Sequence, residues 1–174
     1  AAANPPDQAA SGWDLPGPLA NRFTHLQFSL DPLAWSNAFP NYWGAPPIVP
    51  GLNQATWAHQ RILIAAFIRR KPALLLQVPK EESAQSNAWP SPRTWDVASR
   101  HLAACQAYHL PDDVEAILIA GTIGEGPALE LLAYRRDLDL PDPETVLAHP
   151  ESLIVPERSD MAFAIFAAVT AAVL

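Results

Sequence analysis

The sequence has little cysteine, little charge and no excess of basic residues. Cys105 is the only cysteine among 174 residues, so no disulfide can form within the chain. This fits a reducing compartment, and we predict a cytoplasmic protein in which Cys105 is a small buried residue. The formal net charge is −7, with 18 acidic and 11 basic side chains other than histidine. Because few cations are available to neutralise phosphates, we expect neither nucleic acid nor a membrane as a partner.

A hydrophobic run long enough to span a bilayer is also missing. The C-terminal stretch at 161–174 is apolar and rich in alanine, but it is shorter than the roughly 20 residues that a transmembrane helix needs. This stretch is too apolar to be stable alone in water. We therefore expect a helix that packs back on the rest of the protein.

The composition favours a packed, mainly α-helical protein. Hydrophobic residues make up 49% of the chain and charged residues 17%, and 19 prolines fall between the apolar segments, where they mark helix starts and loop corners. The apolar alternation at 23–30 predicts one short β-strand. Cap residues, prolines and apolar spacing predict helices at 31–38, 53–70, 91–108, 112–121, 126–138, 143–149 and from 159 onward.

Three polar residues lie where the chain should hold them rigidly. Asn4 precedes a double proline, Arg22 follows a loop rich in proline and glycine, and Arg93 comes directly after Ser-Pro at a helix start. A guanidinium keeps its charge near neutrality and offers a planar set of donors that fits phosphate oxygens. A cation in the first turn opposes the helix dipole, so Arg93 is better placed if an anion lies there. The alternatives are an Arg93–Asp96 salt bridge, an ordinary surface arginine and a turn asparagine.

Taken in order, these segments resemble AAA+ ATPases of the MoxR type. The chain carries Ala-Ala-Asn-Pro at 2–5, Leu-Ala-Asn-Arg-Phe at 19–23 and Ser-Pro-Arg at 91–93. In that family the three motifs are the sensor 1 strand end, the arginine finger and the start of the sensor 2 helix in the lid. The resemblance runs from late in the ATPase core to the end of the chain. It implies an ATPase-core remnant at 1–38 and a helical lid domain at 39–174.

The resemblance also implies a role for each residue. Asn4 would position the attacking water, and Arg22 would reach the ATP site of a neighbouring subunit and stabilise charge on the transferred phosphoryl group. Arg93 would contact the γ-phosphate bound by its own subunit and report hydrolysis as lid motion. ATP and Mg²⁺ would be the cofactors of the full-length protein. Its partners would be neighbouring subunits in a homo-oligomeric ring and a client protein that the sequence does not name.

The phosphate-binding loop of such an enzyme is not in this sequence. No Gly-x-x-x-x-Gly-Lys-Ser/Thr motif occurs in it. We therefore expect a fragment of a longer protein that, by itself, neither binds ATP tightly nor hydrolyses it. The alternative hypothesis is a helical module that binds a protein partner without nucleotide.

Other candidates have structural interpretations. The glycine-rich run at 121–126 follows a predicted helix rather than a strand, so we interpret it as a helix end and turn. His101 and His109 do not have a convincing metal-ligand spacing. Trp89 and Trp95 flank Arg93 and are expected to pack in the lid. The aromatic residues around the loop at 40–51 could form a partner-binding surface, although burial is the favoured interpretation for most of them: Trp35, Trp43 and Trp57.

Overall fold

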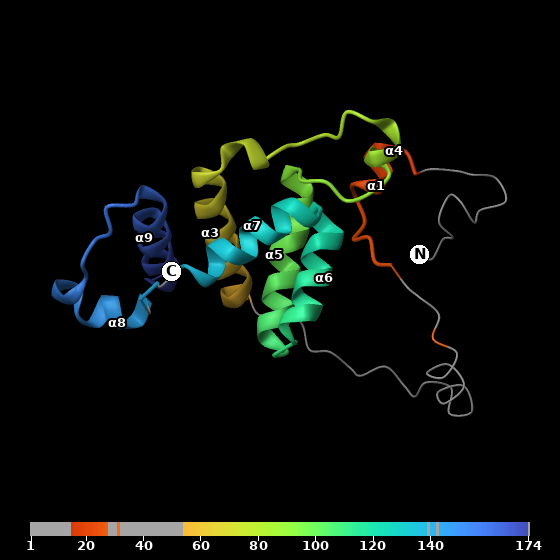
Figure 1. The fold of residues 1–174 in the computed structure, drawn as a ribbon. Helices are drawn as coiled ribbons and strands as arrows, with labels where there is room; N and C mark the ends of the chain where they lie inside the picture. The colour runs from red at the N-terminus through yellow and green to blue at the C-terminus, as the bar shows by residue number, and fades with distance from the viewer. Residues whose placement is uncertain (1–14, 28–30, 32–53, 139, 142, 174) are drawn as a thin grey trace, which may run out of the picture.

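The structure is a computed structural model that describes residues 15–27, 31, 54–138, 140–141 and 143–173. Within these residues the protein is mainly α-helical, as the sequence predicted (Figure 1). The α-helices are α1 (Gly17–Ala20), α3 (Gln54–Arg70), α4 (Glu82–Gln85), α5 (Pro92–Ala107), α6 (Asp112–Ile123), α7 (Glu125–Arg136), α8 (Pro143–Ala148) and α9 (Ser159–Val173). Two 3₁₀ turns, η2 (Pro72–Leu74) and η3 (Pro150–Ser152), interrupt the connections.

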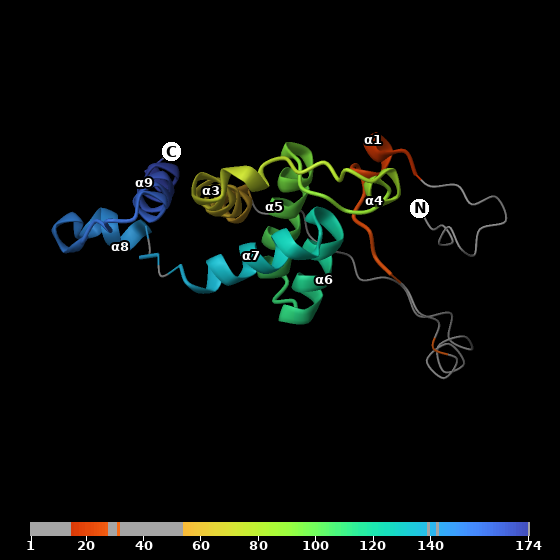
Figure 2. The same ribbon diagram turned by 45° about the horizontal axis from the view of Figure 1, so that its top comes forward.

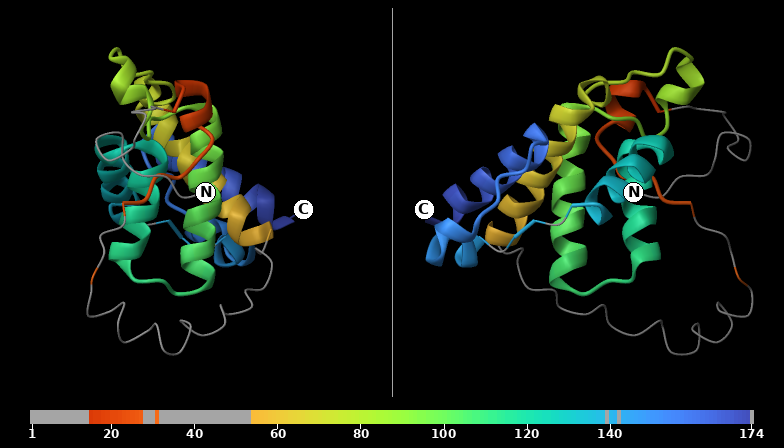
Figure 3. Two further views of the ribbon diagram at one scale, coloured as in Figure 1. Left: turned by 90° about the vertical axis from the view of Figure 1, so that its right-hand side faces the viewer. Right: turned by 60° about the vertical axis from the view of Figure 1, so that its left-hand side comes forward.

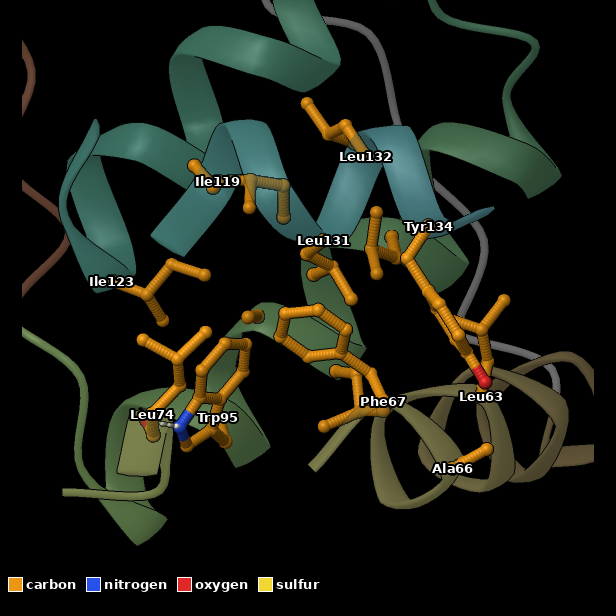
Figure 4. Packing of buried hydrophobic residues seen from close by; sticks show 14 of the residues in the cluster. Leu63, Ala66, Phe67, Leu74, Trp95, Ile119, Ile123, Leu131, Leu132 and Tyr134 are labelled. Atoms are coloured by element: carbon orange, nitrogen blue, oxygen red, sulfur yellow. Dashed lines mark hydrogen bonds between the residues drawn. The ribbon is translucent and has the colours of Figure 1, made fainter. Parts of the chain in front are cut away.

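Four helices form the centre of the molecule. Helix α3 packs on α5, α5 on α6, and α6 on α7, while α7 crosses back to touch α3. Helices α5 and α6 form an antiparallel pair joined by a short connection (Figure 3). The apolar faces of the four helices enclose a core around Phe67, which is 1% exposed. Its ring lies 5.8 Å from that of Trp95 and 5.4 Å from that of Tyr134, measured between centroids (Figure 4).

The C-terminal helix packs back on the body, as predicted from its apolar sequence. Helix α9 lies against α3 on one side and α8 on the other (Figures 1 and 2). Its residues Ala164, Ile165 and Ala168 are buried. None of the described helices is both long and apolar enough to cross a membrane.

The predicted strand at 23–30 is not seen. Its described part, residues 23–27, leaves α1 through a turn and continues as irregular chain, and residues 28–30 lie outside the described part. A strand needs a neighbour with which to exchange backbone hydrogen bonds. Here the His25 amide instead donates to the Gly121 carbonyl, 2.6 Å away in the last turn of α6. The carbonyls of a last helical turn have no amide donor within their own helix. The backbone amide of His25 thus finds its hydrogen-bond acceptor at the end of a helix rather than in a sheet.

Local signals placed most helix boundaries correctly. Helix α5 begins with Ser91 as N-cap and Pro92 as its first residue, as predicted, whereas the N-cap of α6 is Pro111 and not the predicted Asp112. The short helices α1 and α4 were not predicted. The proposed helix at 31–38 lies outside the described residues except for Asp31.

Candidate functional site

The two sequence-predicted arginines lie on two segments that hydrogen bonds join near the start of α5. Arg22 is the second residue after α1, and Arg93 is in the first turn of α5. Both side chains are exposed. Asn4, the third predicted residue, lies outside the described part of the chain.

The start of α5 is fixed by a reciprocal cap. The Ser91 hydroxyl accepts from the Thr94 amide at 3.2 Å, and the Ser91 amide donates to the Thr94 hydroxyl at 2.7 Å. Such a capping box satisfies two backbone donors that the helix itself leaves without partners. Pro92 at the first helical position adds a φ angle already suited to a helix. Arg93 therefore extends from a rigid helix start.

Arg93 has no acidic partner there. Asp96, the partner considered from the sequence, pairs with Arg100 instead, with Nε 3.2 Å from the carboxylate oxygen. The Arg93 side chain forms no hydrogen bond or ion pair with the described residues. Its charge lies at the positive end of the helix dipole. This is a position that an anion can stabilise.

Arg22 is held through its backbone neighbours. Asn21 ends α1, and its amide donates to the Gly17 carbonyl at 3.0 Å. The Arg22 guanidinium donates to the carbonyl of Pro18. This contact leaves the rest of the planar guanidinium fork available to a ligand.

Asn21 connects the two arginine-bearing segments. Its Oδ1 accepts from the Ser91 hydroxyl at 2.6 Å, and its Nδ2 donates to the Trp89 carbonyl at 3.1 Å. Asn21 is 4% exposed and Ser91 is 5% exposed, so these bonds are shielded from water. Arg22 and Arg93 are therefore each within two residues of one buried hydrogen bond.

A second contact holds the same segment farther along α5. The Thr122 hydroxyl donates to the Leu118 carbonyl at 2.7 Å, so its oxygen is left to accept from Thr24, 3.0 Å away. Thr24 in turn accepts from Nε2 of His101 on α5, at 2.8 Å. Burial lowers the pKa of His101 below its usual value. The imidazole is therefore stabilised in its neutral form.

Gly121 allows the backbone of His25 to lie close against α6. A Cβ atom added at Gly121 would lie 2.1 Å from the carbonyl oxygen of His25, much closer than two such atoms can come. The sequence indicated a role for the glycine run at 121–126 only as a helix end and turn. That interpretation holds for Gly124, which follows the end of α6 with a φ of +86°, whereas Gly121 lies inside α6 and Gly126 inside α7.

An open groove of about 480 Å³ lies beside the site. It runs between α3 and α5 and reaches Pro92, next to Arg93. The walls are mainly apolar, with Ile64, Ile68 and Leu75 among them. Beside it, Trp57 of α3 donates to the Ser99 hydroxyl of α5 at 2.8 Å, and the Arg100 guanidinium, also on α5, lies 4.1 Å from the centre of the Trp57 ring. Trp35 and Trp43 lie outside the described residues.

The remaining sequence candidates are structural. Trp95 is 4% exposed and packs in the core, and Trp89 is half-buried. Cys105 is buried, as predicted, and burial raises the pKa of its thiol. In the described part of the chain no group of three or more His, Cys, Asp and Glu side chains could hold a metal ion, and His101 instead binds Thr24.

Arg22 and Arg93 were predicted from the sequence, whereas the residues that hold their segments in place were not. Asn21, Thr24 and His101 act through contacts across 70 or more residues of sequence, which no local pattern reveals. A glycine within a helix was the one available signal, since it can mark close packing of another chain segment.

Comparison with known proteins adds no family assignment. No protein-family model matches the chain, and neither a curated protein nor a solved structure matches it. Function is therefore inferred from the residues of the site itself.

Proposed function

We propose that this chain is the C-terminal part of an AAA+ ATPase of the MoxR type. The single observation that supports this best is the Asn21–Ser91 hydrogen bond, 2.6 Å long, which brings the segments of Arg22 and Arg93 together. Both arginines are exposed, and neither has an acidic partner among the described residues. The order of Asn4, Arg22 and Arg93 along the chain adds the resemblance to that family.

In this proposal the two arginines bind phosphate oxygens. Arg93 contacts the terminal phosphate of the ATP bound by its own subunit, where the N-terminal end of α5 also favours an anion. Arg22 reaches the ATP of the neighbouring subunit in a homo-oligomeric ring. A guanidinium so placed stabilises the charge that spreads over the phosphoryl oxygens during transfer. Asn4 orients the attacking water.

The rest of the ATP site belongs to the longer protein. The sequence has no phosphate-binding loop, and the described residues offer no carboxylate group arranged for Mg²⁺. ATP and Mg²⁺ would therefore be held by the ATPase core upstream of Ala1, and hydrolysis there would remodel a client protein. The isolated chain is expected to be inactive.

Mutation of the arginines in the longer protein tests this proposal. Arg22→Ala and Arg93→Ala should each lower ATP turnover by about 100-fold or more, with ATP binding kept in part, because the lost contacts act on the transition state. Arg100→Ala is the matched control, since it removes an exposed arginine from the same helix, and it should turn over ATP normally. Unchanged turnover in both Arg22→Ala and Arg93→Ala would contradict the assignment.

The apolar groove between α3 and α5 favours a second candidate, a helical protein-interaction module. Aromatic and aliphatic walls of this kind suit an apolar side chain of a partner. The coding sequence upstream of Ala1 separates the two candidates: a glycine-rich loop with a lysine supports the ATPase. If the natural protein starts at Ala1 and ATP does not change its melting temperature, the interaction module is the better assignment.

A further inference from the structure

We propose that Asn21 is a positioning residue that ties Arg22 to the helix start of Arg93, so that the two arginines move as one unit. What the arginines bind rests on the proposed function. That Asn21 joins their two segments follows from its contacts alone.

Asn21 is held by hydrogen bonds of its side-chain amide, its side-chain oxygen and its backbone amide. Its side-chain amide donates to the Trp89 carbonyl and its side-chain oxygen accepts from Ser91, while its backbone amide ends α1 on Gly17. An asparagine side chain is planar, so a bond at each end fixes its orientation as well as its position. The next residue along the chain is Arg22, whose Cα follows at about 3.8 Å.

The partner of Asn21 is the same hydroxyl that caps α5. Ser91 Oγ donates to Asn21 and accepts from the Thr94 amide in the first turn of the helix. A displacement of the start of α5 therefore displaces Asn21 with it. Because Arg93 lies in that first turn, the cap joins one arginine to the helix and Asn21 joins the other to the cap.

A second anchor prevents the segment from swinging about the first. Thr24 is bonded to His101, ten residues beyond Ser91 on α5, which corresponds to about 15 Å along a helix. The His25 amide bonds to Gly121 on α6. Two anchors along one helix define a direction, so the segment at 21–25 follows α5 as a rigid attachment.

The consequence for a ring is coupling between neighbouring sites. Arg93 responds to the nucleotide of its own subunit, and Arg22 acts on the nucleotide of the next. If α5 moves when the terminal phosphate leaves, the Asn21–Ser91 link carries Arg22 with it. One hydrolysis event then changes the charge presented to the neighbouring site, a coupling free energy between two distinct sites.

The test compares Asn21→Ala with Gln27→Ala, which removes an exposed amide from the same segment. In the longer protein, Asn21→Ala should lower turnover about tenfold, with the KM for ATP within about twofold of wild type, because a small misplacement of a catalytic group is costly. Its dependence on ATP concentration should also become less cooperative. Gln27→Ala should behave as wild type.

A double-mutant cycle distinguishes positioning from simple stabilisation. If Asn21 acts through Arg22, then Asn21→Ala should add little to the loss already caused by Arg22→Ala. Full additivity, or wild-type turnover and cooperativity in Asn21→Ala while Arg22→Ala and Arg93→Ala are impaired, would overturn the inference and leave the proposed function standing.

Amide hydrogen exchange on this chain gives a readout that needs no activity. Asn21→Ala should raise the exchange rates of the amides at 22–25, with little change within α3, α6 and α7. Thr24→Val, a nearly isosteric change, should raise exchange mainly at His25. Unchanged exchange in both variants would overturn the positioning role even if both arginines proved essential. If neither arginine affects turnover, the proposed function fails, and exchange still decides whether Asn21 holds the segment.

Discussion

The first described segment of the chain and its last helix are held on the central four helices in different ways: the segment contacts α5 and α6, and α9 contacts α3. The segment at 15–27 buries Ala20 but leaves its large apolar side chains exposed, with Leu19 at 42% and Phe23 at 44%, and is attached by polar contacts. Helix α9 buries Ile165 and two alanines against the body and uses one buried carboxylate, Asp160. One attachment depends on hydrogen-bond direction and the other mainly on apolar area.

This difference suits different tasks. Burial of apolar surface supplies most of the free energy of folding but has little directional preference. A hydrogen bond contributes only about 1 kcal/mol net, yet it is strongly directional. A segment that must present a charged side chain at a fixed place benefits from the second kind of contact. A helix that completes the core benefits from the first.

Asp160 adds directional hydrogen bonds to the packing of α9. Its carboxylate accepts from the Tyr134 hydroxyl at 2.9 Å and from Arg158 at 2.8 Å, with Arg70 at 3.9 Å. Burial raises the pKa of Tyr134, and its hydrogen bond to Asp160 raises it further. Burial alone would raise the pKa of Asp160, but the bonds from Arg158 and Tyr134 outweigh it, so this pKa lies below its ordinary value.

The largest expected effect comes from loss of apolar area in α9. Ile165→Ala removes a side chain that is 4% exposed and should lower the free energy of unfolding by about 3 kcal/mol, or Tm by roughly 10 °C. Leu19→Ala, in the exposed apolar set of the other segment, should change it by less than about 0.5 kcal/mol. Thermal unfolding measures both. Equal losses would show that the two attachments do not differ as described.

The next effect comes from Asp160, the one buried carboxylate among the residues that the structure describes. Asp160→Asn keeps the shape of the side chain but removes the charge that Arg158 and Tyr134 stabilise. We expect a loss of about 2 kcal/mol, the range for hydrogen bonds to a charged group. Glu157→Gln removes an exposed carboxylate nearby and serves as the control. Equal stability of Asp160→Asn and wild type in urea unfolding would mean that apolar area alone holds α9.

A glycine substitution separates the first segment from the body with little effect on global stability. Gly121→Ala should favour α6 itself by up to about 1 kcal/mol, because alanine is the better helix former. The added Cβ would collide with the His25 carbonyl, so the segment must move away. Hydrogen exchange at His25 should rise while Tm changes little. Retained protection of the His25 amide would show that the segment adapts without leaving α6.

The sequence predicted the helices better than it predicted the contacts between distant segments. Ser91 and Pro92 mark the start of α5 because capping and proline geometry act over a few residues. The strand at 23–30 was wrong because alternation cannot tell whether a neighbouring strand exists. Asp96 had arginines at both i−3 and i+4, and pairing with Arg100 follows the favoured i,i+4 orientation, which leaves Arg93 without that partner.

The smallest expected effect is a difference in acid sensitivity between the two attachments. The pKa of His101 is lowered by burial, so the docked segment binds fewer protons than the undocked one, and its attachment should weaken as pH falls below about 6.5. The lowered pKa of Asp160 acts in the other range: its stabilisation is complete above about 3.8 and is lost only as pH falls through that lowered pKa. At pH 5 the amides at 22–25 should therefore exchange faster relative to those of α9 than at pH 7.5, after correction for intrinsic rates. His101→Gln can still donate to Thr24 but does not titrate, so it should abolish this difference. A pH dependence that persists in His101→Gln would place the titrating group elsewhere.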